Sequence, residues 1–184
     1  MLAKENHTQY AILGLLKTGF HTGYSIKQMI DGSLNHFWKI SYGQIYPSLK
    51  RLEEEGYAAV KVTPQESKPD KKEYFITPKG EQILKKWLQQ PIQELPIEKN
   101  ELLLKLFFSR NQDINTSIQH LDTYQEKLIT RYNTYEGIKE MINTQLMEEE
   151  DAPFWIITLD YGLCMTQAEI DWCKDTKKKL VKEE

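Results

Sequence analysis

The hydrophobic pattern of this chain changes period twice within residues 41–90. The first stretch has apolar side chains at the 3.6-residue spacing of a helix. Two runs of alternating apolar and polar residues follow, with a charged, turn-rich tip between them, as in a β-hairpin. A helical pattern then returns at Pro78, which occupies the favoured first position of a helix. The pattern predicts a helix over residues 41–55, strands over 57–63 and 72–77, and a helix over 78–90.

Two further helical patterns precede this segment. They cover residues 7–17 and 22–33, and a short extended piece is expected over 37–40. Three helices, a β-hairpin and a fourth helix follow the plan of a winged helix-turn-helix domain, in which the third helix is the one that meets DNA. We therefore assign residues 1–90 to such a domain.

The helix predicted over residues 41–55 carries Pro47 in its first half. Proline in a helix interior costs about 3 kcal/mol, because its N–H is missing and its ring clashes with the preceding turn. We therefore expect the regular helix to begin near Gly43, with an irregular entry that turns Ser41 to Pro47 outward. A short helix that projects polar groups from its first turns is typical of a DNA recognition helix. An ordinary amphipathic surface helix is the alternative.

Positive charge is concentrated in the N-terminal half. Residues 1–90 contain 13 Lys and Arg against 9 Asp and Glu, a net charge of +4, whereas residues 91–184 contain 11 against 18, a net charge of −7. This asymmetry is expected of a basic module that meets a polyanion, joined to an acidic module with another role. Lysines also gather at the hairpin tip, where they can reach a phosphate backbone: Lys68, Lys71 and Lys72. Chance scatter of solvated surface charge is the alternative.

Beyond a linker over residues 91–97, helical patterns continue through a second domain, 98–184. They cover residues 98–109, 114–147 and 153–180. The stretches ELLLKLFF and PFWIITLDYGLCM are apolar on nearly all sides, which is more surface than three helices can bury alone. We therefore expect a homodimer, whose two recognition helices would lie about one helical turn of DNA apart on a pseudo-palindromic operator.

Three segments resemble the PadR family of bacterial transcriptional regulators. They are FWKISYGQIYPSLKRLEEEGY, TGYSI at the second helix and PQESKPDKKEYFITPKG at the hairpin. The C-terminal half resembles the helical domain of the longer family members, including AphA-like virulence regulators. The resemblance implies a mainly α fold with a small β-hairpin wing and an all-α dimerisation domain. It also implies a dimeric DNA-binding regulator, usually a repressor, with its recognition helix in the major groove and its wing on the minor groove or backbone.

The resemblance further implies which residues contact double-stranded DNA. They lie on the second helix, the third helix and the wing: Gly23, Tyr24, Ser41, Tyr42, Gln44, Tyr46, Pro47, Lys50, Lys68, Lys71 and Lys72. Gln44 is the best candidate for a base contact, because an amide can pair bidentately with adenine. Lys50 and the wing lysines suit phosphates, and backbone N–H groups at the start of the second helix can hold another. Tyr42 and Tyr46 can instead be packed against the domain.

Members of this family often respond to small aromatic or phenolic compounds. Aromatic side chains of the second domain are candidates to line such a site: Phe107, Phe108, Phe154, Trp155, Tyr161 and Trp172. An apolar cavity between helices, with a few polar groups, is the form that we expect of the site. The alternative is that these aromatic side chains fill the core of a dimer.

Other classes of protein find little support. No apolar run approaches the roughly 20 residues that span a bilayer, and the first residues lack the apolar core of a signal peptide, so a cytoplasmic location is expected. The four histidines lack metal-ligand spacing, and no phosphate loop or nucleophile motif occurs, so neither an enzyme nor a metal or cofactor is expected. Cys164 and Cys173 lie about 13 Å apart on one predicted helix, too far for a disulfide. A winged-helix module that binds another protein remains an alternative.

Overall fold

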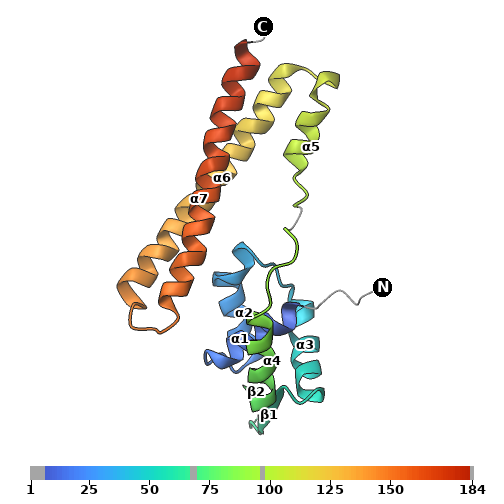
Figure 1. Cartoon of the computed structure of the whole chain (residues 1–184), viewed down its shortest axis with the longest axis vertical. Coiled ribbons are helices and arrows are strands. Elements are labelled where there is room, and N and C mark those ends of the chain that lie inside the picture. The colour runs from blue at the N-terminus through green and yellow to red at the C-terminus, as the bar shows by residue number, and fades with distance from the viewer. Residues whose placement is uncertain (1–6, 67–69, 96–97, 183–184) are drawn as a thin grey trace. The chain divides into compact units, whose positions relative to one another are not determined.

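The chain folds into two compact units in the computed structural model, which describes residues 7–66, 70–95 and 98–182 (Figure 1). The units are Met1–Leu95 and Pro96–Glu184. Helices dominate both units, and the two short strands belong to the first. Within the described residues, no helix is long and apolar enough to cross a membrane.

The N-terminal unit has the predicted order of elements. These are α1 (His7–Lys17), α2 (Gly23–Gly32), the 3₁₀ turn η1 (Leu34–His36), α3 (Tyr42–Glu54), β1 (Ala58–Thr63), β2 (Lys71–Ile76) and α4 (Pro78–Leu88). The strands pair antiparallel, with Ala58 opposite Ile76 and Thr63 opposite Lys71. The extended piece predicted over residues 37–40 is wrong at its start, because the Phe37 N–H bonds the Leu34 carbonyl and closes a turn.

The predicted irregular entry to the third helix is absent. α3 begins at Tyr42 with Ser41 as its N-cap, so Pro47 lies in the second turn rather than in or beside the first. The proline leaves the carbonyl of Gly43 without its usual helical donor. Gly43 and Pro47 are both exposed, so water can take the place of that bond, which explains how the helix tolerates the proline.

Backbone hydrogen bonds close the base of the hairpin and join its second strand to the loop between α1 and α2. The Tyr74 N–H donates to the His21 carbonyl at 2.7 Å, and the Thr77 N–H donates to the Tyr57 carbonyl at 3.0 Å. A Cβ on Gly80 would lie 2.2 Å from the Tyr57 carbonyl oxygen, so only glycine lets α4 approach this closely. Beneath the hairpin, the apolar faces of α1, α2 and α3 form a closed core that includes Ile12, Ile26 and Leu49.

The C-terminal unit contains only helices among its described residues: α5 (Glu101–Phe107), the 3₁₀ turn η2 (Ser109–Asn111), α6 (Ile114–Gln145) and α7 (Ala152–Lys182). α6 and α7 lie side by side as a long antiparallel pair, and α5 packs on α6 (Figure 1). The large apolar residues of α6 that are buried recur every seven positions: Leu121, Leu128, Tyr135 and Ile142. This seven-residue spacing is the heptad-like pattern of a helix that packs along its length against another helix.

A polar network crosses the α6–α7 pair. Tyr124 donates to Glu169 at 3.0 Å, Arg131 forms an ion pair with Glu169, and the Arg131 Nε donates to Thr166 at 3.1 Å. Asn100, which caps α5 through the Leu103 N–H, also donates to the Tyr124 hydroxyl. The network therefore fixes the register of α6 and α7 and anchors the start of α5.

Candidate nucleic-acid interface

The outward faces of α2 and α3 expose three tyrosines. Tyr24 is 65% exposed, Tyr42 50% and Tyr46 62%. The opposite faces of the same helices carry Ile26, Ile30, Ile45 and Leu49 in the core. Large side chains grouped in this way outside the core mark a surface for interaction, since a folded unit alone does not need them there.

Tyr42 is held by two residues of α2. Its hydroxyl donates to the Asp31 carboxylate, and the Lys27 Nζ lies 4.1 Å from the centre of its ring, a cation–π contact. The hydrogen bond to Asp31 raises the pKa of Tyr42, because removing the phenol proton would leave two negative charges side by side. The ring is thus placed at the start of α3 with its hydroxyl direction fixed.

Gly23 lies under the ring of Tyr46. A Cβ at this position would lie 2.6 Å from the ring, so a larger residue would displace the tyrosine. The packed and the DNA-contacting roles considered for Tyr46 are therefore compatible, because one edge rests on Gly23 while most of the side chain stays exposed. Tyr24, next to it, accepts a hydrogen bond from Gln28 at 3.1 Å.

Gln44 is folded back onto the start of α3. Its Oε1 accepts hydrogen bonds from the backbone N–H and the hydroxyl of Ser41, both at 2.9 Å. A bidentate pair with adenine needs the same oxygen as an acceptor. Gln44 can therefore contact a base in that way only after it releases Ser41.

The remaining predicted residues of α3 lie on the same exposed side. Gln44 and Pro47 line a shallow depression together with Gly43, Ser48 and Arg51. Lys50 lies 3.5 Å from Glu54, and Arg51 pairs with Glu55 at 2.7 Å. Exposed pairs of this kind are weak, so both cations can turn to a phosphate at little cost.

The wing carries its lysines on different faces. Lys71 pairs with Glu73 at 2.8 Å, and this hydrogen bond lowers the pKa of Glu73, an effect that Lys61 and His21 reinforce. Lys72 is exposed opposite Val62, on the other face of the hairpin. Lys68 lies outside the described residues.

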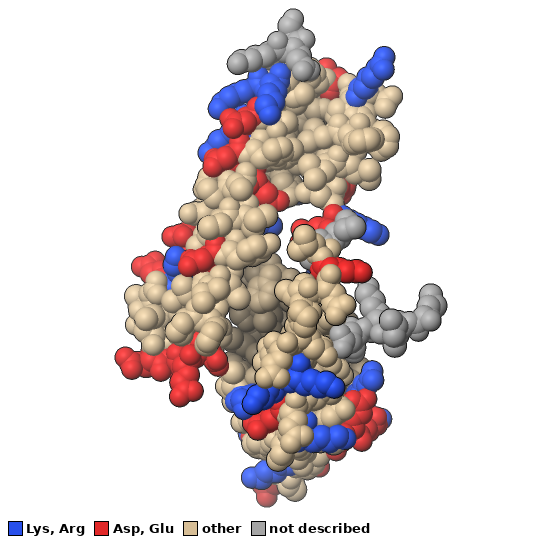
Figure 2. All heavy atoms as spheres, viewed as in Figure 1, with Lys and Arg blue, Asp and Glu red and all other residues tan. Residues whose placement is uncertain are grey.

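Figure 2 shows basic and acidic side chains interspersed over the N-terminal unit on the face in view, and acidic side chains gathered at the turn between α6 and α7. The sequence of that turn is EEED, residues 148–151. Among the described residues, no group of His, Cys, Asp and Glu is arranged to hold a metal ion.

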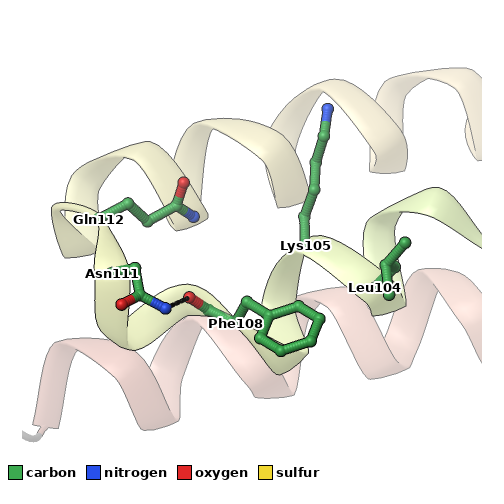
Figure 3. A pocket seen from close by; sticks show the side chains of 5 residues that line it. All are labelled: Leu104, Lys105, Phe108, Asn111 and Gln112. Carbon is green, nitrogen blue, oxygen red and sulfur yellow. Dashed lines mark hydrogen bonds between the residues drawn. The ribbon is translucent and has the colours of Figure 1, made fainter.

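The candidate effector residues are not gathered around one cavity within a single chain. Phe107, the last residue of α5, contacts Phe108, its C-cap, edge to face with ring centres 5.1 Å apart, whereas four others are spread along α7: Phe154, Trp155, Tyr161 and Trp172. Of the six, Phe108 alone lines the open depression of about 280 Å³ beside α5, with Leu104, Lys105, Asn111 and Gln112 (Figure 3).

Four residues of α2, α3 and the wing were not among the candidates named from the sequence: Lys27, Asp31, Arg51 and Lys61. A signal for two of them was present, because Tyr24, Lys27 and Asp31 recur at helical spacing on the polar side of α2. Their contacts with Tyr42 could not be predicted from the sequence, since these contacts depend on how α2 packs against α3.

Comparison with known proteins identifies this arrangement. The model of the transcriptional regulator PadR-like family matches residues 12–86, and the model described as virulence activator alpha C-term matches residues 98–181. The negative transcriptional regulator PadR of Bacillus subtilis (strain 168) is 39% identical over 155 residues, which cover 81% of this chain and 84% of the relative. The matched families and proteins are transcriptional regulators, not enzymes.

Solved structures share the whole fold. Bacillus subtilis PadR in complex with operator DNA has a TM-score of 0.83 and 27% identity, covering 94% of this chain and 98% of that chain. The complex of the same protein with p-coumaric acid has a TM-score of 0.80 and 25% identity, covering 97% of this chain and 98% of that chain. The virulence activator AphA of Vibrio cholerae has a TM-score of 0.73 and 25% identity, covering 96% of this chain and 99% of that chain.

These matches confirm the winged helix-turn-helix domain and the helical C-terminal region predicted from the sequence. A relative that is 39% identical covers 81% of the chain, so this chain belongs to the PadR-like family of transcriptional regulators.

Proposed function

We propose that this chain is a homodimeric repressor that binds a pseudo-palindromic operator in the cytoplasm and is released by a small aromatic acid. In this proposal residues 1–90 bind DNA, residues 98–184 form the dimer, and residues 91–97 link them. The observation that carries the proposal is the exposed surface of α2 and α3, where three tyrosines are held by contacts within the unit and stay accessible.

Repression is supported by the relative's description as a negative regulator, and operator binding by the solved complex of that protein with DNA. For this chain, α3 would enter the major groove with its N-terminal residues on base edges, while the exposed lysines of the wing meet phosphates. The contacts would be those named from the sequence on α2, α3 and the wing.

The homodimer is supported by a stripe of exposed apolar side chains on α7. They recur at three- and four-residue intervals on one face: Phe154, Ile157, Tyr161 and Met165, with Trp172 two turns further. Isolated apolar residues are normal on a surface, but a continuous helical stripe is typical of an interface. A dimer also presents two recognition helices, as a pseudo-palindromic operator requires.

The aromatic effector is supported by the solved complex of the Bacillus subtilis relative with p-coumaric acid. In this chain the exposed aromatic residues of the C-terminal unit are suited to line a site for such a ligand once a second chain covers them. Release from DNA requires that the ligand bind the DNA-incompetent conformation more tightly than the competent one.

The test is DNA affinity by fluorescence anisotropy at several salt concentrations. The probe is the DNA upstream of this protein's own gene, with a shuffled probe of equal length as the control. We expect the native probe to bind at least about a hundredfold more tightly, and log affinity to fall linearly with log salt concentration. Equal binding to both probes would contradict specific recognition there, and absence of binding at low salt would favour the protein-interaction module.

A further inference from the structure

Asp31 occupies a position where a carboxylate is disfavoured on two counts. It is the penultimate residue of α2, next to the negative end of the helix dipole. It also lies beside Tyr42 on the surface proposed to meet DNA phosphates, which repel a negative charge. A carboxylate in this place needs a compensating role.

Contacts of Asp31 indicate what that role is. One carboxylate oxygen accepts a hydrogen bond from the Tyr42 hydroxyl, and the other accepts one from the Asn35 side chain at 3.1 Å. Asn35 in turn accepts from the backbone N–H of Ile40 at 2.9 Å. Asp31 therefore joins α2 both to the first residue of α3 and to the segment that leads into it, while Lys27 covers the Tyr42 ring.

The hydrogen bond to Asp31 limits what Tyr42 can bind. A tyrosine hydroxyl has one proton and two lone pairs. While its proton is engaged in the hydrogen bond to Asp31, the Tyr42 oxygen can only accept further hydrogen bonds. Phosphate oxygens also only accept, so they cannot bond this hydroxyl. In the major groove, the amino groups of adenine and cytosine are the donors.

We propose that Asp31 is a specificity-determining residue that converts Tyr42 from a phosphate contact into an acceptor for the amino group of an adenine or a cytosine. The inference rests on the proposed function, in which α3 enters the major groove. Tyr42 is the first residue of α3, and the N-terminal residues of a recognition helix are those that contact base edges. The role belongs to Asp31 because its carboxylate accepts the hydrogen bond that the Tyr42 hydroxyl donates.

The experiment uses the full chain and the native upstream probe, the shuffled probe, and a set of native probes with each base pair replaced in turn. The variants are Asp31→Ala, Tyr42→Phe, their double mutant and Asp31→Asn. Glu81→Ala is the charge-matched control, because Glu81 pairs with Lys17 between α4 and α1 and contacts none of the candidate DNA residues in the described structure. Thermal melts verify that each variant is folded.

We expect wild type to lose about tenfold in affinity when one particular adenine or cytosine is replaced. Asp31→Ala, Tyr42→Phe and the double mutant should all lose this discrimination by the same factor. Asp31→Ala should bind the shuffled probe no more weakly than wild type, since it removes a charge that repels phosphates. Asp31→Asn should keep the discrimination, because its single amide oxygen can still accept the hydrogen bond from Tyr42 while its NH₂ group gives up only the contact with Asn35. Glu81→Ala should behave like wild type.

Wild-type discrimination in Asp31→Ala would overturn the inference and leave the proposed function standing. An equal loss of affinity for native and shuffled probes in Asp31→Ala would also overturn it, since that pattern indicates a purely structural role. A loss in Asp31→Asn as large as in Asp31→Ala would have the same consequence. If wild type did not prefer the native over the shuffled probe, the proposed function would fail and the inference with it.

Discussion

The two units of this protein expose large side chains in different ways. On α2 and α3 the exposed residues are tyrosines, and each has a partner on α2: Gln28 for Tyr24, Asp31 for Tyr42 and Gly23 for Tyr46. On α7 the exposed stripe contains Phe154, Ile157 and Met165, which can form no such hydrogen bonds, together with Tyr161 and Trp172.

This difference separates two kinds of partner. A tyrosine keeps a polar tip, so it can stay hydrated until another polar surface, such as DNA, replaces the water. An apolar stripe gains free energy only when a second apolar surface covers it. The N-terminal unit is therefore suited to a hydrated, charged partner and the C-terminal unit to another protein chain.

The largest effect is expected from placing a charge in the apolar stripe. In Tyr161→Glu the carboxylate would be desolvated in a dimer, so we expect the dissociation constant of the dimer to rise by at least about a hundredfold. Sedimentation velocity over a range of concentrations measures the change. Gln167→Glu, on the charged flank of the same helix, adds the same charge and should dimerise like wild type. A dimer of unchanged stability in Tyr161→Glu would show that the stripe on α7 does not bind a second chain, which contradicts the distinction drawn between the two surfaces.

A smaller effect is expected from Gln44→Ala on the polar surface. The variant should lose about tenfold in operator affinity, mostly at one base position, and about 1 kcal/mol in the free energy of unfolding through loss of the cap. Anisotropy with base-substituted probes and a thermal melt measure the two effects. Ser41→Ala weakens the cap but keeps the amide, so equal losses in both variants would show that Gln44 serves the helix alone.

The sequence predicted the elements because their periods are set locally. Alternation on both sides of residues 64–71 needs no knowledge of the rest of the fold to indicate a hairpin, and helical spacing indicated α3 and α6 in the same way. The apolar stretch within α7 was recognised as excessive because its length exceeds what neighbouring helices can cover. Such predictions depend only on residues that are close in the sequence.

The site was predicted less completely because its contacts join segments that are distant in the sequence or depend on one side-chain rotamer. The bond from Tyr42 to Asp31 depends on how α2 packs against α3, and the bonds between Gln44 and Ser41 depend on the rotamer of Gln44. The position of Pro47 was misjudged because the cost of proline was weighed without the exposure that lets water replace the lost bond.

Gly23→Ala tests whether the placement of Tyr46 matters. The new Cβ would lie 2.6 Å from the end of a flexible side chain, so the ring should move while the free energy of unfolding changes little. We expect a loss of about fivefold in operator affinity, measured by anisotropy. Gly14→Ala is the matched control, because nothing lies within 4 Å of its Cβ, and it should leave DNA binding unchanged. Wild-type affinity in Gly23→Ala would show that Tyr46 is only packed.

The smallest effect is expected from Glu73, which forms an ion pair with Lys71 in the wing. In Glu73→Gln the lysine is free for a phosphate, so affinity for native and shuffled probes should rise together by about two- to threefold and the salt dependence should steepen. The pKa of Glu73 is lowered, so its carboxylate stays charged at neutral pH and the difference from wild type should be constant between about pH 6 and pH 8. The pair would be lost only as the pH falls through that lowered pKa, where wild type should approach the variant. Glu81→Gln frees Lys17 outside the wing, so if both variants gained equally, the wing would contribute only to the overall charge of the unit rather than a specific phosphate contact.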